Sequence, residues 1–82
     1  MIRLTMDDVR CEILFASELQ PSDALTADEV AEVLSRTVRR IGVAGCVSRM
    51  AQEFGDHPEA AARRMRWVRR VCLAAGTAQR AA

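Results

Sequence analysis

The side chains best placed to do chemistry lie in residues 54–70, which read FGDHPEAAARRMRWVRR. This segment holds five arginines together with the only tryptophan and the only histidine of the chain. At about 100° per residue, a helix brings three of the arginines onto one side, here called the arginine face. The arginine face consists of Arg63, Arg66 and Arg70, with Glu59 in line and Trp67 at its border. Guanidinium groups suit phosphates and guanine edges, and a neighbouring indole can stack on a base, so the segment predicts a surface that binds DNA or another partner.

Other interpretations of the arginine face stay open. Surface charge is usually solvated, so the face can be the wet side of an ordinary helix, or it can pair with acids elsewhere in the chain. An acidic protein surface is a second kind of partner that it would fit. Trp67, in turn, can cover the edge of a small core while its indole N–H stays in water.

Catalytic and metal-binding patterns are weak. His57 is the only candidate general base, and no Ser–His–acid or Cys–His pattern surrounds it, so a helix-capping role for Asp56 or His57 is favoured. Cys11, Cys46 and Cys72 are far apart and form no CxxC pair, which indicates buried thiols and not a disulfide or a zinc site. We therefore expect a non-enzymatic protein without cofactor, metal or small-molecule substrate, in a reducing cytoplasmic compartment and with no secretory leader.

Length and composition favour one small helical domain. The chain has 82 residues, of which 50% are hydrophobic and 4% aromatic, and this composition buries well through helices. The core of such a chain contributes only about 3–5 kcal/mol to the net free energy of unfolding, and the domain has little room for a deep, enclosed site. Residues 1–32 hold eight acids and two arginines, whereas residues 33–82 hold ten arginines and three acids. We expect a domain over residues 1–76, a frayed tail over 77–82 and no membrane span.

Apolar spacing and capping signals predict an all-α bundle of four short helices, over residues 6–19, 27–41, 44–54 and 58–75. Thr26 and Glu29 form a capping box before the second helix. Gly42 and Gly55 are placed to end the second and third helices. The third helix carries an apolar side formed by Val43, Val47, Met50, Ala51 and Phe54.

The first predicted helix carries two apolar stripes. One stripe consists of Val9, Ile13 and Ala16, and the other of Cys11, Phe15 and Leu19. A helix of this kind is either wedged between two other helices or shares one stripe with a second molecule. The stripe of Cys11, Phe15 and Leu19 is therefore the candidate homodimer contact.

Residues 50–70, MAQEFGDHPEAAARRMRWVRR, resemble a helix-turn-helix. In that resemblance Ala51 is the small residue at the helix crossing, Gly55 is the turn glycine after Phe54, and Pro58 opens the recognition helix. The resemblance implies that Glu59 and the arginine face would lie against nucleic acid.

Two positions depart from the helix-turn-helix pattern. Asp56 follows the turn glycine where an apolar residue is usual, and Arg64 falls on a late core position that Met65 can fill instead. The whole chain, with its segments LFASELQPSD and FGDHPEAAARRMRWVRR, also resembles short, uncharacterised, all-helical proteins of actinomycete type, a group that implies no activity. We interpret the chain as a small DNA-associated regulatory protein with a basic C-terminal helix. The alternative is a protein-interaction or homodimerisation module without nucleic-acid contact.

Overall fold

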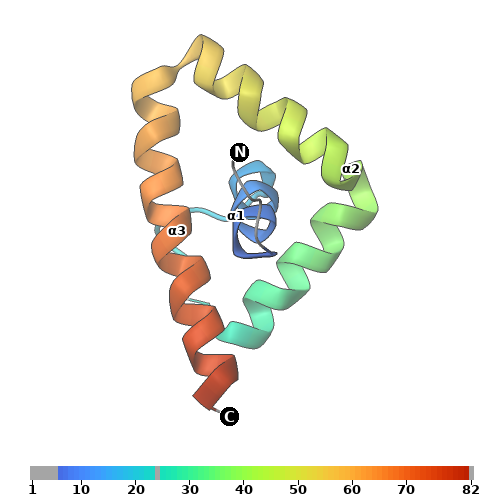
Figure 1. Ribbon diagram of the computed structural model, residues 1–82, viewed down its shortest axis with the longest axis vertical. Coiled ribbons are helices and arrows are strands. Elements are labelled where there is room, and N and C mark those ends of the chain that lie inside the picture. Colours follow the sequence, from blue (N-terminus) through green and yellow to red (C-terminus); the bar gives the residue numbers. More distant parts are fainter. Residues whose placement is uncertain (1–5, 24, 82) are drawn as a thin grey trace.

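The computed structural model describes residues 6–23 and 25–81, and the side chains of residues 8–23 and 25–75. The described chain is all-helical and consists of α1 (Met6–Ala16), α2 (Ala27–Asp56) and α3 (Pro58–Ala81). The predicted all-α class is therefore right, but the predicted bundle of four helices is wrong. Figure 1 shows α2 and α3 as two long arms that meet at one corner, with the short α1 between them.

Helix α1 ends at Ala16, three residues before the predicted end at Leu19. The reason is Ser17, whose hydroxyl donates to the Leu14 carbonyl at 2.6 Å and accepts from the Leu19 N–H at 3.2 Å. A serine that bonds the neighbouring backbone in this way offers the chain an alternative to helical hydrogen bonds. The chain leaves the helix there and enters the connection to α2.

Helix α2 begins where the sequence predicts. Thr26 is its N-cap, and the reciprocal hydrogen bonds of the capping box with Glu29 are present. Its end is different, because the two helices predicted over 27–41 and 44–54 form one element with a kink at Gly42. Gly42 has φ 71° and ψ 166°, a backbone conformation that glycine adopts without steric cost. The chain turns at this one residue and resumes the helix with no intervening loop, which is why four predicted helices become three.

Helix α3 begins at Pro58, as predicted, and continues to Ala81, past the predicted end at Ala75. Only His57 separates it from α2. Proline suits the first turn of a helix because its missing N–H would have no partner there. The predicted tail over 77–82 thus has a helical backbone as far as Ala81, and Ala82 lies outside the described residues.

The core forms on both sides of α1. One cluster joins α1 to the start of α2 and to α3 through Cys11, Leu14, Leu19, Val30, Val68 and Cys72. The other joins α1 to the middle of α2 through Ile13, Ala16 and Cys46. Helix α1 is therefore wedged between two helices, which is the first of the two interpretations of its double stripe.

The apolar side predicted for residues 44–54 is only partly used in this core. Val43, Val47 and Phe54 are each more than a third exposed, and Ala51 is exposed as well. An 11-residue α1 is about 16 Å long and cannot cover the whole length of a 30-residue α2. The second half of α2 consequently contacts α1 through Cys46 and, near its end, through the stacking of Phe54 on Phe15.

Candidate functional site

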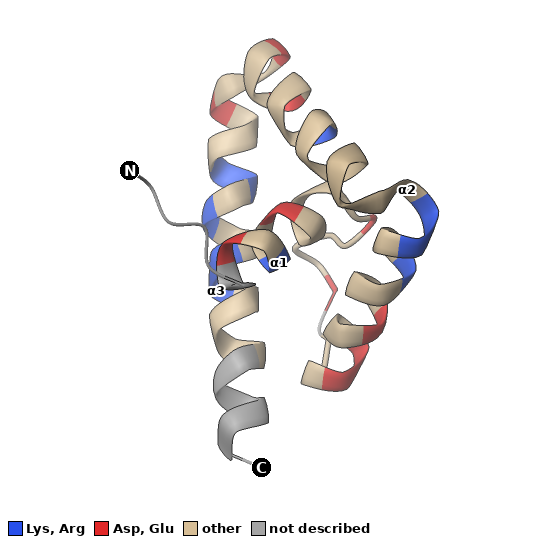
Figure 2. Cartoon of the chain, turned by 45° about the vertical axis from the view of Figure 1, so that its right-hand side comes forward, with Lys and Arg blue, Asp and Glu red and all other residues tan. Residues whose placement is uncertain are grey.

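Helix α3 presents the arginine face to solvent. Arg63, Arg66 and Arg70 are all exposed, as is Glu59 one turn before them. None of the three arginines makes a hydrogen bond or ion pair with another described residue. Figure 2 shows the basic residues of α3, in blue, gathered along the middle of this helix. The three side chains predicted to bind a partner thus share one exposed side.

Trp67 lies at the edge of the core and not on the open part of this surface. Its ring is half-buried and packs against the core cluster that contains Leu14 and Val68. The guanidinium carbon of Arg64 lies 5.5 Å from the ring centroid, so one face of the indole is already covered. This placement favours the interpretation in which Trp67 closes the core.

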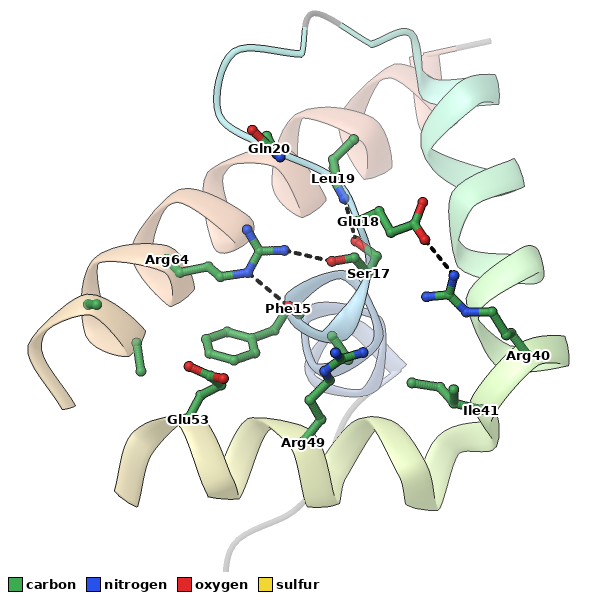
Figure 3. Close-up of a pocket in the computed structure, with 13 residues that line it drawn as sticks. Phe15, Ser17, Glu18, Leu19, Gln20, Arg40, Ile41, Arg49, Glu53 and Arg64 are labelled. Carbon is green, nitrogen blue, oxygen red and sulfur yellow. Dashed lines mark hydrogen bonds and ion pairs between the residues drawn. The ribbon is translucent and has the colours of Figure 1, made fainter. Parts of the chain in front are cut away.

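Arg64 points inward, in contrast to Arg63 directly before it. Its Nε donates to the Phe15 carbonyl at 2.8 Å, and its Nη2 donates to the Ser17 carbonyl at 3.0 Å and to the Leu14 carbonyl at 3.4 Å. These carbonyls lie at the C-terminal end of α1, where a helix leaves acceptors without intrahelical donors. A cation there also interacts favourably with the helix dipole. Arg64 is thus a C-terminal cap of α1 supplied by α3, as Figure 3 shows.

The surroundings of Arg64 make it a structural residue. Its guanidinium lies over the Phe15 ring, 5.6 Å from the centroid, as well as over Trp67. Burial lowers the pKa of Arg64, and the nearby Glu53 carboxylate opposes this effect. An arginine stays charged at any physiological pH even when its pKa falls somewhat. The sequence signal for this role was an arginine at a position where the helix-turn-helix pattern expects an apolar residue.

An open cleft of about 690 Å³ lies in the angle between α2 and α3, at the end of α1. The Arg40 Nη1 and Glu18 Oε1 atoms form an ion pair of 2.5 Å across it. The hydrogen bond and charge of Arg40 lower the pKa of the Glu18 carboxyl. Arg49 and Glu53 also line the cleft, and Figure 3 shows both side chains directed into it from α2. No sequence pattern predicts this cleft, because its residues come from four separate segments with no common motif.

The three cysteines are buried thiols. Cys11 of α1 and Cys72 of α3 interact through their side chains, and Cys46 of α2 packs against Ile13 and Ala16. Burial, and next the neighbouring Cys72, raise the pKa of Cys11 to about 12. Burial also raises the pKa of Cys46. Thiols held in their neutral form are poor nucleophiles, which favours a packing role for Cys11 and Cys46.

His57 caps through its backbone. Its N–H donates to the Glu53 carbonyl at 2.7 Å, and its own carbonyl accepts from the Ala61 N–H at 2.9 Å. It thus ends α2 and starts α3 at once, whereas Asp56 is the last residue of α2. Among the described residues, no group of three His, Cys, Asp or Glu side chains could hold a metal ion.

The stripe considered as a homodimer contact lies inside the chain's own core. Cys11, Phe15 and Leu19 are all buried. Phe15 stacks on Phe54 with ring centroids 5.7 Å apart. A contact between two copies therefore has to use residues other than this stripe unless the core opens.

No protein-family model, curated protein or solved structure matches the chain. Within the described residues, none of the helices combines the length and the apolarity needed to cross a bilayer.

Proposed function

We propose that the protein binds DNA through the arginine face of α3 and acts as a small, non-enzymatic regulatory protein. The proposal is supported by the contrast between adjacent arginines of one helix. Arg64 uses its donors on backbone carbonyls of α1, whereas Arg63 is exposed and makes no hydrogen bond or ion pair with a described residue. Arg66 and Arg70 are likewise exposed and make no hydrogen bond or ion pair with a described residue. Their donors remain available for phosphate oxygens, which arginine binds with a two-pronged fork.

The spacing of the arginine face sets the expected strength of binding. Residues 63 and 70 are about 10 Å apart along the helix axis. One DNA strand presents a phosphate about every 3.4 Å along the duplex axis, so three arginines can reach about three phosphates. Binding through so few phosphate contacts is weak, non-specific and strongly dependent on salt. Glu59 lies at one end of the same face and opposes the approach of phosphate.

The test is fluorescence anisotropy of a labelled duplex, titrated with the full chain at about 50 mM and about 200 mM salt. We expect Arg63→Ala, Arg66→Ala and Arg70→Ala each to weaken binding and to reduce the salt slope by about one unit for each phosphate that is no longer bound. Glu59→Gln should strengthen binding, since it removes a like charge. Arg36→Ala is the matched control, because Arg36 is an exposed arginine on α2.

Three results would contradict the proposal. The first is no anisotropy change with tens of micromolar protein at about 50 mM salt, where even non-specific binding is detected. The second is an equally weakened binding of Arg36→Ala, which would show that total charge and not the arginine face determines binding. The third is a large drop in the thermal stability of the variants of the arginine face, which would assign these arginines to the fold. Failure to bind DNA combined with salt-sensitive capture by an acidic protein would support the second kind of partner.

A further inference from the structure

Two cysteines that are far apart in sequence meet where α1 packs on α3. The side chains of Cys11 on α1 and Cys72 on α3 are joined by a hydrogen bond. Both residues belong to the core cluster that α1 forms with α3 and the start of α2. Cys46 belongs to the other cluster, between α1 and the middle of α2. The fold thus brings two of the three thiols into contact and places the third in a different part of the core.

A small cavity of about 180 Å³ leads to this pair of thiols. Its lining consists of Asp8, Cys11, Arg69, Cys72 and Leu73. Arg69 and Leu73 are exposed, so the cavity opens to solvent along the side of α3. Cys11 and Cys72 keep exposed fractions of 9% and 7%, whereas Cys46 is 0% exposed. A reagent of a few atoms therefore reaches the paired thiols, and not Cys46, while the chain stays folded.

The two paired thiols are not equivalent. Burial, and next the neighbouring Cys72, raise the pKa of Cys11 to about 12, so Cys11 keeps its proton. The thiolate and not the thiol is the nucleophile, so the first attack on a reagent in the cavity falls to Cys72. Arg69, at the mouth of the cavity, favours a negatively charged sulfur there, whereas Asp8 opposes it. The packing role of Cys11 in the reduced protein is compatible with a reaction in which it takes part second.

We propose that Cys11 and Cys72 form a reversible disulfide, made by exchange with a small disulfide that enters this cavity, and that the bond clamps α1 to α3. In the first step the Cys72 Sγ loses its proton and attacks one sulfur of the reagent, whose S–S bond breaks; the released thiolate takes up the proton. The Cys11 Sγ then loses its proton and attacks the Cys72 Sγ, which releases the second half of the reagent as a thiol. The protein pair is oxidised by two electrons and the small disulfide is reduced by two.

The expected consequence of the bond is a more stable fold. A disulfide between Cys11 and Cys72 closes a loop that contains most of the chain, and the constraint on the unfolded state grows with the length of the loop. The same two helices are joined without a covalent bond by Arg64 of α3, which caps α1. This inference does not depend on DNA binding, because Cys72 is buried on α3 whereas the arginine face is exposed.

The test is oxidation of the full, folded chain with bis(2-hydroxyethyl) disulfide, followed by alkylation of the remaining thiols in urea and tryptic peptide mapping. Cleavage after arginine places the three cysteines in separate peptides, residues 11–36, 41–49 and 71–80. We expect peptides 11–36 and 71–80 to be joined by a disulfide, and peptide 41–49 to carry an alkylated Cys46. Dithiothreitol should separate the joined peptides again, because exchange is reversible.

Thermal unfolding measures the clamp itself. The oxidised wild type should melt about 10 °C or more above the reduced wild type. Cys11→Ala and Cys72→Ala should show no such rise after the same treatment, whereas Cys46→Ala is the matched control and should show the full rise. Circular dichroism before oxidation confirms that each variant is folded.

Several results would overturn the proposal. One is a folded wild-type chain that keeps all three thiols under the oxidising treatment, and another is a disulfide that contains Cys46 as often as Cys11. A bond between Cys11 and Cys72 that forms only in urea would show that the fold does not bring the two sulfurs together. An oxidised wild type that melts no higher than the reduced wild type would refute the clamp. Because peptide mapping uses the wild type alone, it decides the pairing even where a variant does not fold.

Discussion

Replacing Arg64 with alanine should destabilise the protein far more than replacing its neighbour Arg63. Two hydrogen bonds from the charged Arg64 guanidinium, at 2.8 and 3.0 Å, end on carbonyls of Phe15 and Ser17. A bond to a charged group contributes about 1.5–3 kcal/mol, and each cation–π contact about 0.5–1 kcal/mol. Because the residue is only half-buried, water can replace part of these interactions in the variant. The expected net destabilisation is about 2–4 kcal/mol, whereas an exposed arginine such as Arg63 is worth less than about 0.5 kcal/mol.

The assay is thermal and urea unfolding of both variants, followed by circular dichroism. For a domain of this size, the expected destabilisation lowers the melting temperature of Arg64→Ala by about 10–30 °C. Arg64→Lys should recover only a small part, because a single ammonium cannot serve the two carbonyls with the geometry of the guanidinium fork. Equal melting temperatures for Arg64→Ala and Arg63→Ala would refute the capping role of Arg64.

Three further predictions concern the backbone and the titrating groups. Gly42→Ala should cost about 1–3 kcal/mol, because Gly42 has φ 71° and ψ 166°, a conformation that essentially only glycine adopts. Gly55→Ala should instead stabilise the protein by about 0.5–1 kcal/mol, since Gly55 is helical and the added Cβ meets no atom within 4 Å. The urea midpoints of the two variants test this difference. The pKa of Cys11 is raised from 9.0 to about 12, so the neutral, buried thiol stabilises the fold fully below pH 9, and this stabilisation is lost as the pH rises toward 12. Between about pH 8 and 10.5, the urea midpoint of Cys11→Ala should therefore fall less than that of the wild type. Arg40 lowers the pKa of Glu18, so their ion pair stabilises the fold above the ordinary carboxyl pKa and is lost in acid. Glu18→Gln should therefore make the urea midpoint less dependent on pH below about pH 5. The same pH dependence in the variant and the wild type would contradict the pairing.

Local signals in the sequence located two helix starts but neither the number of helices nor where α1 and α3 end. The capping box at Thr26 and the proline at Pro58 fixed two helix starts, because both act through residues close in sequence. The kink at Gly42 was harder to predict, since a glycine that ends a helix and a glycine that bends one look the same in a sequence. The early end of α1 at Ala16 depends on Ser17 and on Arg64, the latter far away in sequence.

The candidate site was predictable to a similar degree. Helical periodicity alone places Arg63, Arg66 and Arg70 on one side, and they are exposed together. The inward direction of Arg64 could not be derived, because it depends on where the end of α1 lies. The apolar side of residues 43–54 was predicted, but the exposure of Val43, Val47 and Phe54 was not, since periodicity identifies an apolar side but not whether the same chain is long enough to cover it.

The contacts of Arg64 also bear on the order of events during synthesis. Its hydrogen bond to the Phe15 carbonyl spans 49 residues of sequence, and the apolar stripes of α1 are buried partly against the same distant helix. At about 5–20 residues per second, a ribosome needs about 2–10 s to add the residues between these two partners. During that interval α1 has been made but its partner on α3 has not, so Cys11, Phe15 and Leu19 lack the part of their cover that α3 supplies. The nascent chain is therefore most exposed to aggregation, and most accessible to chaperones, through the helix that later becomes the centre of the fold.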